Sequence, residues 1–110
     1  MNINDVIADS QWTLLNSPGE TNQTIQGVFA CDLLSHVMGF ANEGELLVTV
    51  LNNINVLGVV HLLDLSGVVF PHNIQVQQSI IDKANELGIP LLSTSMTTAD
   101  TVVALHKLGV

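Results

Sequence analysis

Residues 46–64 read Leu-Leu-Val-Thr-Val-Leu-Asn-Asn-Ile-Asn-Val-Leu-Gly-Val-Val-His-Leu-Leu-Asp, and this stretch decides the predicted fold class. It begins with a short run of apolar and β-branched residues, which is typical of a strand buried on both faces of a parallel sheet. Asn52 and Asn53 interrupt the run with side chains that favour turns and helix N-caps. A helix from Ile54 to Asp64 is expected to follow. The stretch therefore predicts one strand–helix unit of an α/β fold.

The predicted helix over 54–64 has a narrow polar face. Its polar or small residues are spaced by three and form one stripe, whereas apolar residues cover the rest of its surface. A surface helix of a globular protein normally keeps a wider polar face. We therefore expect this helix to be covered on more than one side, by its own sheet and by a second copy of the chain. The dimer-interface residues predicted on it are Leu57, Val60, His61 and Asp64.

Strands and helices are predicted to alternate along most of the chain. Residues 1–24 predict a short helix, a short strand over 12–15 and a loop, and Asp32 is placed to cap a later helix. The order and the short linkers predict a single α/β domain over residues 1–110, with a mainly parallel β-sheet and helices packed on it. Besides the unit above, the βα repeats over 25–110 comprise predicted strands at 25–31, 68–70 and 89–92 and predicted helices at 33–41, 74–87 and 97–108.

The charge balance excludes one class of partner and favours another. The chain has ten acidic residues, two lysines and no arginine, for a formal charge of −8. Nucleic acids and anionic membranes are bound through Lys and Arg, so we expect neither as a partner. Charged residues make up only 11% of the chain, against about 25% in a typical protein. So few charges leave neutral surface in water and predict a homodimer; a monomer coated with Asn, Gln, Ser and Thr is the alternative.

The predicted compartment is the cytoplasm. The single cysteine, Cys31, allows no intrachain disulfide and fits a reducing environment. Asp5 and Asp9 stand near the start of the chain, where a signal peptide would carry basic residues and an apolar run. Asparagines and a histidine interrupt the longest apolar stretch, which argues against a membrane span.

Polar side chains are predicted to gather where the parallel strands end. Ligands of open parallel sheets collect beyond the carboxyl ends of the strands, near helix N-termini, and such a site suits a carboxylate or a phosphate. The alternative is a set of capping loops whose side chains satisfy their own backbone amides. The candidate ligand-binding residues are Asp32, Asn52, Asn53, Ser93, Thr94, Ser95 and Thr97.

Patterns for catalysis and metal binding are absent from the sequence. The four histidines fall in four different predicted elements without metal-ligand spacing, so we expect no metal and no cofactor. A phosphate-binding Gly-x-x-x-x-Gly-Lys-Ser/Thr loop is missing as well. We therefore predict that the protein is not an enzyme. Chemistry at the strand end formed by Cys31 and Asp32 is the remaining alternative, and for it Cys31 would have to be a reactive thiolate.

Three stretches resemble the small bacterial DRTGG domain: residues 27–39 (Gly-Val-Phe-Ala-Cys-Asp-Leu-Leu-Ser-His-Val-Met-Gly), 43–49 and 86–94. That domain is similar to the N-terminal domain of HPr kinase/phosphorylase and to a middle segment of some phosphotransacetylases. The resemblance implies an α/β fold and a regulatory or dimerising module without an activity of its own. Such modules occur alone or beside CBS and kinase domains.

The residues that name the family are replaced in this chain. The Asp-Arg pair aligns with Asn52-Asn53, and the Thr-Gly-Gly aligns with residues 71–73, which read Pro-His-Asn. Two functions follow as hypotheses. The first is a non-catalytic regulatory or interaction module that forms a homodimer and binds an unidentified protein partner. The second is a sensor of a small anionic ligand, a nucleotide or phosphometabolite, that binds at the carboxyl rim of the sheet.

Overall fold

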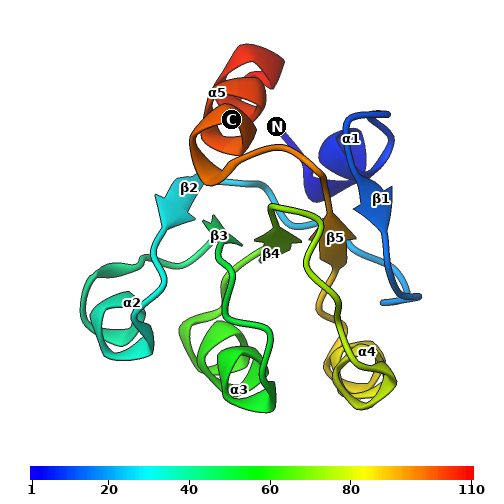
Figure 1. The fold of residues 1–110 in the computed structure, drawn as a ribbon, viewed down its shortest axis with the longest axis vertical. Coiled ribbons are helices and arrows are strands. Elements are labelled where there is room, and N and C mark those ends of the chain that lie inside the picture. The colour runs from blue at the N-terminus through cyan, green and yellow to red at the C-terminus, as the bar shows by residue number, and fades with distance from the viewer.

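The computed structural model describes residues 1–110, which form one five-stranded sheet with helices on both faces (Figure 1). The strands are β1 (Thr13–Leu14), β2 (Gly27–Ala30), β3 (Glu45–Val48), β4 (Gly67–Phe70) and β5 (Leu91–Ser93), and the helices are α1 (Ile3–Ile7), α2 (Leu34–Phe40), α3 (Ile54–Leu63), α4 (Gln78–Leu87) and α5 (Thr98–Leu108). Helices α2, α3 and α4 cover one face of the sheet, and α1 and α5 lie on the other. The predicted α/β class is confirmed.

Four of the strands are parallel and adjacent in chain order, β2, β3, β4 and β5, and the short β1 pairs antiparallel with β5 at one edge. The register places Leu47 of β3 between Phe29 of β2 and Val68 of β4. All four residues of β4 are buried, as expected for a central parallel strand with helices on both faces. The mainly parallel sheet predicted from the apolar runs is confirmed.

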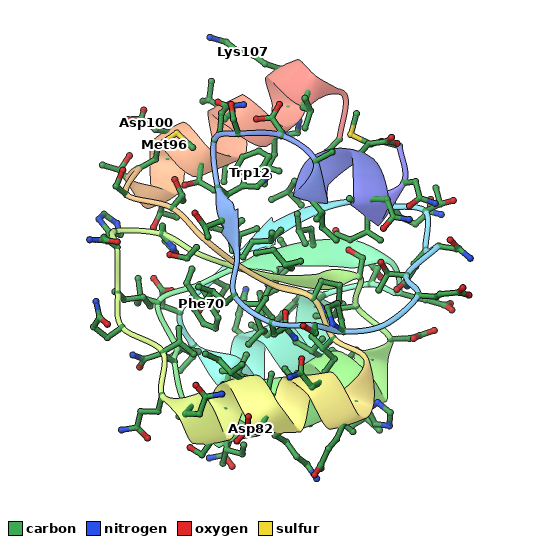
Figure 2. The ribbon with its side chains drawn as sticks, turned by 90° about the vertical axis from the view of Figure 1, so that its right-hand side faces the viewer. Trp12, Phe70, Asp82, Met96, Asp100 and Lys107 are labelled. Atoms are coloured by element: carbon green, nitrogen blue, oxygen red, sulfur yellow. The ribbon has the colours of Figure 1, made fainter.

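Alternate residues of the central strands fill two separate cores. Leu47, Val68 and Leu91 point into the core below the sheet, which α2, α3 and α4 complete. Leu46, Val69 and their neighbours point into the core above it, with residues of α1 and α5. This alternation follows from the two-residue period of a strand. Figure 2 shows Trp12 on the side that α5 covers and Phe70 on the side that α4 covers.

Helix α3 is the middle helix of its layer, and this position explains its narrow polar face. It lies between α2 and α4, so its own neighbours cover its flanks as well as its inner side (Figure 1). Leu57 and Val60 are each 1% exposed and belong to the core below the sheet. Their burial corrects the prediction that these two side chains contact a second copy. The exposed apolar residues of α3 are Ile54 and Leu62.

The helix predicted from Ile74 begins four residues later, at Gln78. Gln77 is still extended, with φ −69° and ψ 150°. Ile74 and Val76 nevertheless pack against the core below the sheet. Apolar side chains two residues apart reach the same side of an extended segment, so this segment buries them without forming a helix.

Candidate functional site

The loops that follow β2, β3, β4 and β5 meet at one edge of the sheet because these strands are parallel. We call this edge the carboxyl rim. It carries the seven residues predicted to bind a ligand. The rim is built as two hydrogen-bonded halves, one between the ends of β2 and β3 and one between the ends of β4 and β5. Each half has its own internal partners.

In the first half, Asp32 joins the end of β2 to the end of β3. One oxygen of its carboxylate, Oδ1, accepts hydrogen bonds from the Thr49 hydroxyl at 3.0 Å and from the Val50 main-chain amide at 2.9 Å. The Thr49 hydroxyl in turn accepts from the Leu51 amide at 3.1 Å. The predicted capping role of Asp32 is wrong, since α2 begins after Leu33 with no side-chain cap. Asp32 instead fixes the β3–α3 loop, because the neighbouring strand end lies within its reach.

In the second half, Thr94 is the centre of a network between the loops after β4 and β5. Thr94 is 5% exposed, and its hydroxyl donates to the Gln11 carbonyl at 3.0 Å and accepts from the Met96 amide at 3.2 Å. Its main-chain oxygen accepts from the Asn73 amide at 2.8 Å. A hydroxyl that is buried with both a donor and an acceptor partner has little left to offer a ligand. Thr94 therefore holds the rim together.

The hydroxyl of Thr97 is also engaged, since it accepts a hydrogen bond from the Asp100 amide at 3.0 Å and caps α5. Helix α5 therefore begins with a side-chain cap, within the helix predicted over 97–108. Ser95 is exposed and Ser93 is half-buried. These two are the predicted hydroxyls of the loop for which the structure gives no side-chain hydrogen bond.

A contact that sequence reasoning missed is made by His72. Its Nε2 atom lies 3.3 Å from both the amide and the hydroxyl of Thr98, at the start of α5. His72 and Asn73 have φ angles of 63° and 53°, in the left-handed region that glycine adopts most readily. In the alignment of the sequence analysis, these two positions correspond to the Gly-Gly of the DRTGG motif. That motif is the sequence signal that could have predicted a left-handed turn here.

Asn52 and Asn53 line a separate hollow, where the end of β3 meets the start of α4. The Asn52 side chain donates to the Gln75 carbonyl at 2.7 Å, and Asn53 caps α3 by accepting from the Asn55 amide at 3.0 Å. The hollow measures about 550 Å³ and has no charged residue in its lining. Ser93, Thr94, Ser95 and Thr97 are not part of it. Asp32 does not line it either, so the structure separates Asn52 and Asn53 from the other predicted ligand-binding residues.

The outer sides of α2 and α3 form a surface without charged side chains, which we call the α2–α3 face. Residues 33–42 and 50–63 contain no Asp, Glu, Lys or Arg. Five of the eight large hydrophobic side chains that are exposed in the molecule lie in these stretches. They are Leu33 at 61%, Met38 at 51%, Phe40 at 64%, Ile54 at 47% and Leu62 at 70% exposure.

His61 and Asp64, the other two predicted interface residues, are exposed at the carboxyl end of α3. Both line a hollow at the opposite edge of the sheet from the rim. Asp64 ends α3 in the left-handed conformation, with φ 57°. Cys31 is half-buried against the core below the sheet, with its sulfur 3.6 Å from the Leu33 carbonyl oxygen. No three side chains of His, Cys, Asp or Glu gather as they would around a metal ion.

A model of a protein family matches most of the chain. The model of the DRTGG domain matches residues 5–108, nearly the whole chain. The chain belongs to the DRTGG domain family. The resemblance inferred from residues 27–39, 43–49 and 86–94 is thereby confirmed.

A solved structure shares the fold of this DRTGG domain. It is the crystal structure of the CBS and DRTGG domains of the regulatory region of Clostridium perfringens pyrophosphatase, complexed with its activator, diadenosine tetraphosphate. The TM-score is 0.66 at 13% sequence identity, and the match covers 93% of this chain and 45% of that one. The chain thus spans less than half of that regulatory region. None of the curated proteins matches the chain. Its helices are all too short or too polar to cross a membrane.

Proposed function

We propose that this DRTGG domain is a non-catalytic regulatory module that works as a homodimer, with the α2–α3 face as the contact between the two copies. The observation that carries the proposal is the absence of charge on this face. A chain with a formal charge of −8 repels its own copies over most of its surface. The α2–α3 face is where two copies can meet without bringing carboxylates together.

The exposed side chains of the α2–α3 face also supply the energy of association. Leu62, Phe40 and Leu33 are each more than half exposed, and apolar area buried between proteins contributes about 25 cal/mol per Å². Single exposed apolar residues are common in proteins, whereas five of the eight large hydrophobic side chains exposed in this chain lie in the two stretches that make up this face. A stable interface buries roughly 1,200–2,000 Å² in total, so each copy has to contribute about half of that area.

The test is the mass of the protein in solution, measured by light scattering coupled to size-exclusion chromatography. The wild type is expected at twice the chain mass of 11.8 kDa. Leu62→Asp places a carboxylate in the proposed contact and should give the monomer mass. The matched control is Val103→Asp, which alters a half-exposed valine of α5 on the other side of the sheet and should stay dimeric. A monomeric wild type, or a dimeric Leu62→Asp variant, would contradict the proposal.

The second candidate function is a sensor of a nucleotide or phosphometabolite in the hollow beside Asn52 and Asn53. The size of this hollow, about 550 Å³, and its place at the start of α3 favour it, since helix N-termini attract anions. The related pyrophosphatase region was crystallised with a nucleotide activator. The lining has no Lys or Arg to pair with phosphate, so affinity would depend on amides alone.

Two substitutions of Asn53 separate ligand binding from helix capping. Asp and Ser both serve as N-caps, so Asn53→Asp and Asn53→Ser should each leave the melting temperature nearly unchanged. Under the sensor hypothesis, adenine nucleotides raise the melting temperature of the wild type and of Asn53→Ser. The added carboxylate of Asn53→Asp should abolish that rise. An unchanged melting temperature across nucleotides and acetyl phosphate would exclude a sensor for these ligands.

A further inference from the structure

Gly58 lies in the middle of α3, where a glycine is unfavourable. Glycine in a helix interior lowers the folding equilibrium constant about fivefold relative to alanine, because it loses more backbone entropy on folding. The backbone of Gly58 keeps the right-handed conformation of the helix. A Cβ atom built at this position would have no neighbouring atom within 4 Å. Neither the backbone conformation nor the packing of the protomer therefore requires a glycine here.

The missing side chain opens a hollow on the outer surface of α3. Ile54, Gly58 and Leu62 are spaced by four residues, so they lie on the same side of the helix. All three are exposed. The glycine thus leaves a notch between two large apolar side chains. The hollow above it measures about 370 Å³ and is bordered by the half-buried side chains of Leu34 in α2 and Leu87 in α4.

The lining of this hollow suits an apolar side chain. Most of the lining residues are apolar, and Lys83 of α4 is the only charged one. The ammonium group of Lys83 is already paired with the Glu86 carboxylate at 3.2 Å. Covering apolar surface that faces water is favourable, whereas a charged ligand would find no free partner here. The occupant that the lining favours is therefore an apolar side chain.

The α2–α3 face carries both the hollow and side chains that can fill one. Leu33 and Phe40 project from α2 with 61% and 64% of their surface exposed. A twofold interface uses the same patch on both copies, so one patch has to supply the projecting side chains as well as the space that receives them. A second copy of this chain, which carries a formal charge of −8, also meets no carboxylate at this face. These properties together favour a second copy as the occupant.

We propose that Gly58 is the point of closest approach between the two copies, with an apolar side chain of the second copy in the space above it. This inference rests on the dimer contact proposed above and specifies where that contact is tightest. The glycine then costs stability in the protomer and is compensated in the dimer, because the missing side chain lets the two surfaces approach. Substitution of Gly58 should therefore affect folding and association in opposite directions.

The test measures association and folding separately. In sedimentation equilibrium, Gly58→Ala should raise the dissociation constant of the dimer at least about tenfold, because each copy pushes one methyl group into a packed contact. Gly58→Leu fills the notch and should give the monomer mass where the wild type is a dimer. In the monomeric Leu62→Asp background, Gly58→Ala should raise the melting temperature by about 3–5 °C. That rise excludes misfolding as the cause of weaker association.

Gly39→Ala is the matched control. Gly39 is an exposed glycine of α2 that also has open space at the Cβ position, but it does not line the hollow. Its substitution should raise the dissociation constant much less than Gly58→Ala.

The outcomes separate this inference from the dimer contact on which it rests. If Leu62→Asp is monomeric but Gly58→Leu dimerises like the wild type, the α2–α3 contact stands and the role of Gly58 is overturned. Equal weakening by Gly39→Ala and Gly58→Ala, or a lower melting temperature for Gly58→Ala in the monomeric background, would overturn it as well. A monomeric wild type, or a dimeric Leu62→Asp variant, would overturn both proposals.

Discussion

Helices α2 and α3 on one face of the sheet and α5 on the other cover separate cores but present different outer surfaces. Helix α4, which lies beside α3, carries charged residues and the exposed Lys83–Glu86 ion pair. On one side of the sheet, α2 and α3 carry no charged residue and expose leucine, methionine, phenylalanine and isoleucine side chains. On the other side, the first turn of α5 carries Asp100 and its last turn carries His106 and Lys107. Figure 2 shows Asp100 and Lys107 on this outer layer. The apolar residues on the inner faces are needed to form the two cores. The exposed apolar residues of α2 and α3 are not, and this difference favours association through these two helices.

The inner faces of the two layers should be equally sensitive to truncation. Leu57 of α3 is 1% exposed and Leu105 of α5 is fully buried. Replacing either by alanine should lower the free energy of unfolding by about 2–5 kcal/mol, through lost transfer energy and a remaining cavity. Urea denaturation at one low protein concentration measures this, with the outer residues Leu62→Ala and Val103→Ala as controls that change protomer stability by about 0.5 kcal/mol or less. A well-tolerated Leu57→Ala would contradict its place in the core.

Loss of the link that Asp32 makes between the ends of β2 and β3 should have the next largest effect on stability. Asp32→Ala removes the acceptor for the Thr49 hydroxyl and the Val50 amide, and hydrogen bonds to a charged group contribute about 1.5–3 kcal/mol. Asp32→Asn keeps an oxygen in the same place and should cost less. If the two variants were equally destabilised in urea, the negative charge and not the hydrogen-bond geometry would be the important property.

The caps of α3 and α5 should respond alike to truncation, although these two helices lie on opposite faces of the sheet. Asn53→Ala and Thr97→Ala each remove one side-chain acceptor from the first turn of a helix, and the typical cost is about 1 kcal/mol. Ser95→Ala, at an exposed position in the same loop as Thr97, is the control and should change the melting temperature little. A loss at Thr97 far above the loss at Asn53 would show that the rim network depends on Thr97 beyond its cap.

Added salt should change the dissociation constant of the dimer and should hardly change the stability of the folded protomer. If the contact is free of charged groups, added salt screens the repulsion between two chains of charge −8 without weakening any ion pair between them. The dissociation constant of the dimer should therefore fall several-fold when NaCl is raised from low to moderate concentration. Sedimentation equilibrium measures it, and a rise in the dissociation constant would place charged pairs in the interface.

Local patterns in the sequence were sufficient to predict the fold. The β-branched run before Asn52 and the cap at Asn53 marked a strand and a helix that the structure contains. The helix predicted from Ile74 was too long. Residues 74–77 alternate apolar and polar side chains, which is the signal of an extended segment, and it was available in the sequence.

The candidate site was less predictable than the fold, because its side chains contact residues that lie in other helices, strands and loops. Whether Leu57 meets the sheet or a second copy depends on α3 lying between α2 and α4, which a nearly all-apolar helix does not reveal. Thr94 looked like a ligand contact until its hydroxyl was found between Gln11 and Met96.

The most direct test of the account is an isotope-filtered NOE experiment on a mixture of ¹³C-labelled and unlabelled protein, which detects contacts between copies only. The account predicts intermolecular NOEs among the side chains of Leu33, Met38, Phe40, Ile54 and Leu62, and none from Val103 of α5. Intermolecular NOEs from Val103, or from neither surface, would contradict the assignment of the α2–α3 face as the dimer contact.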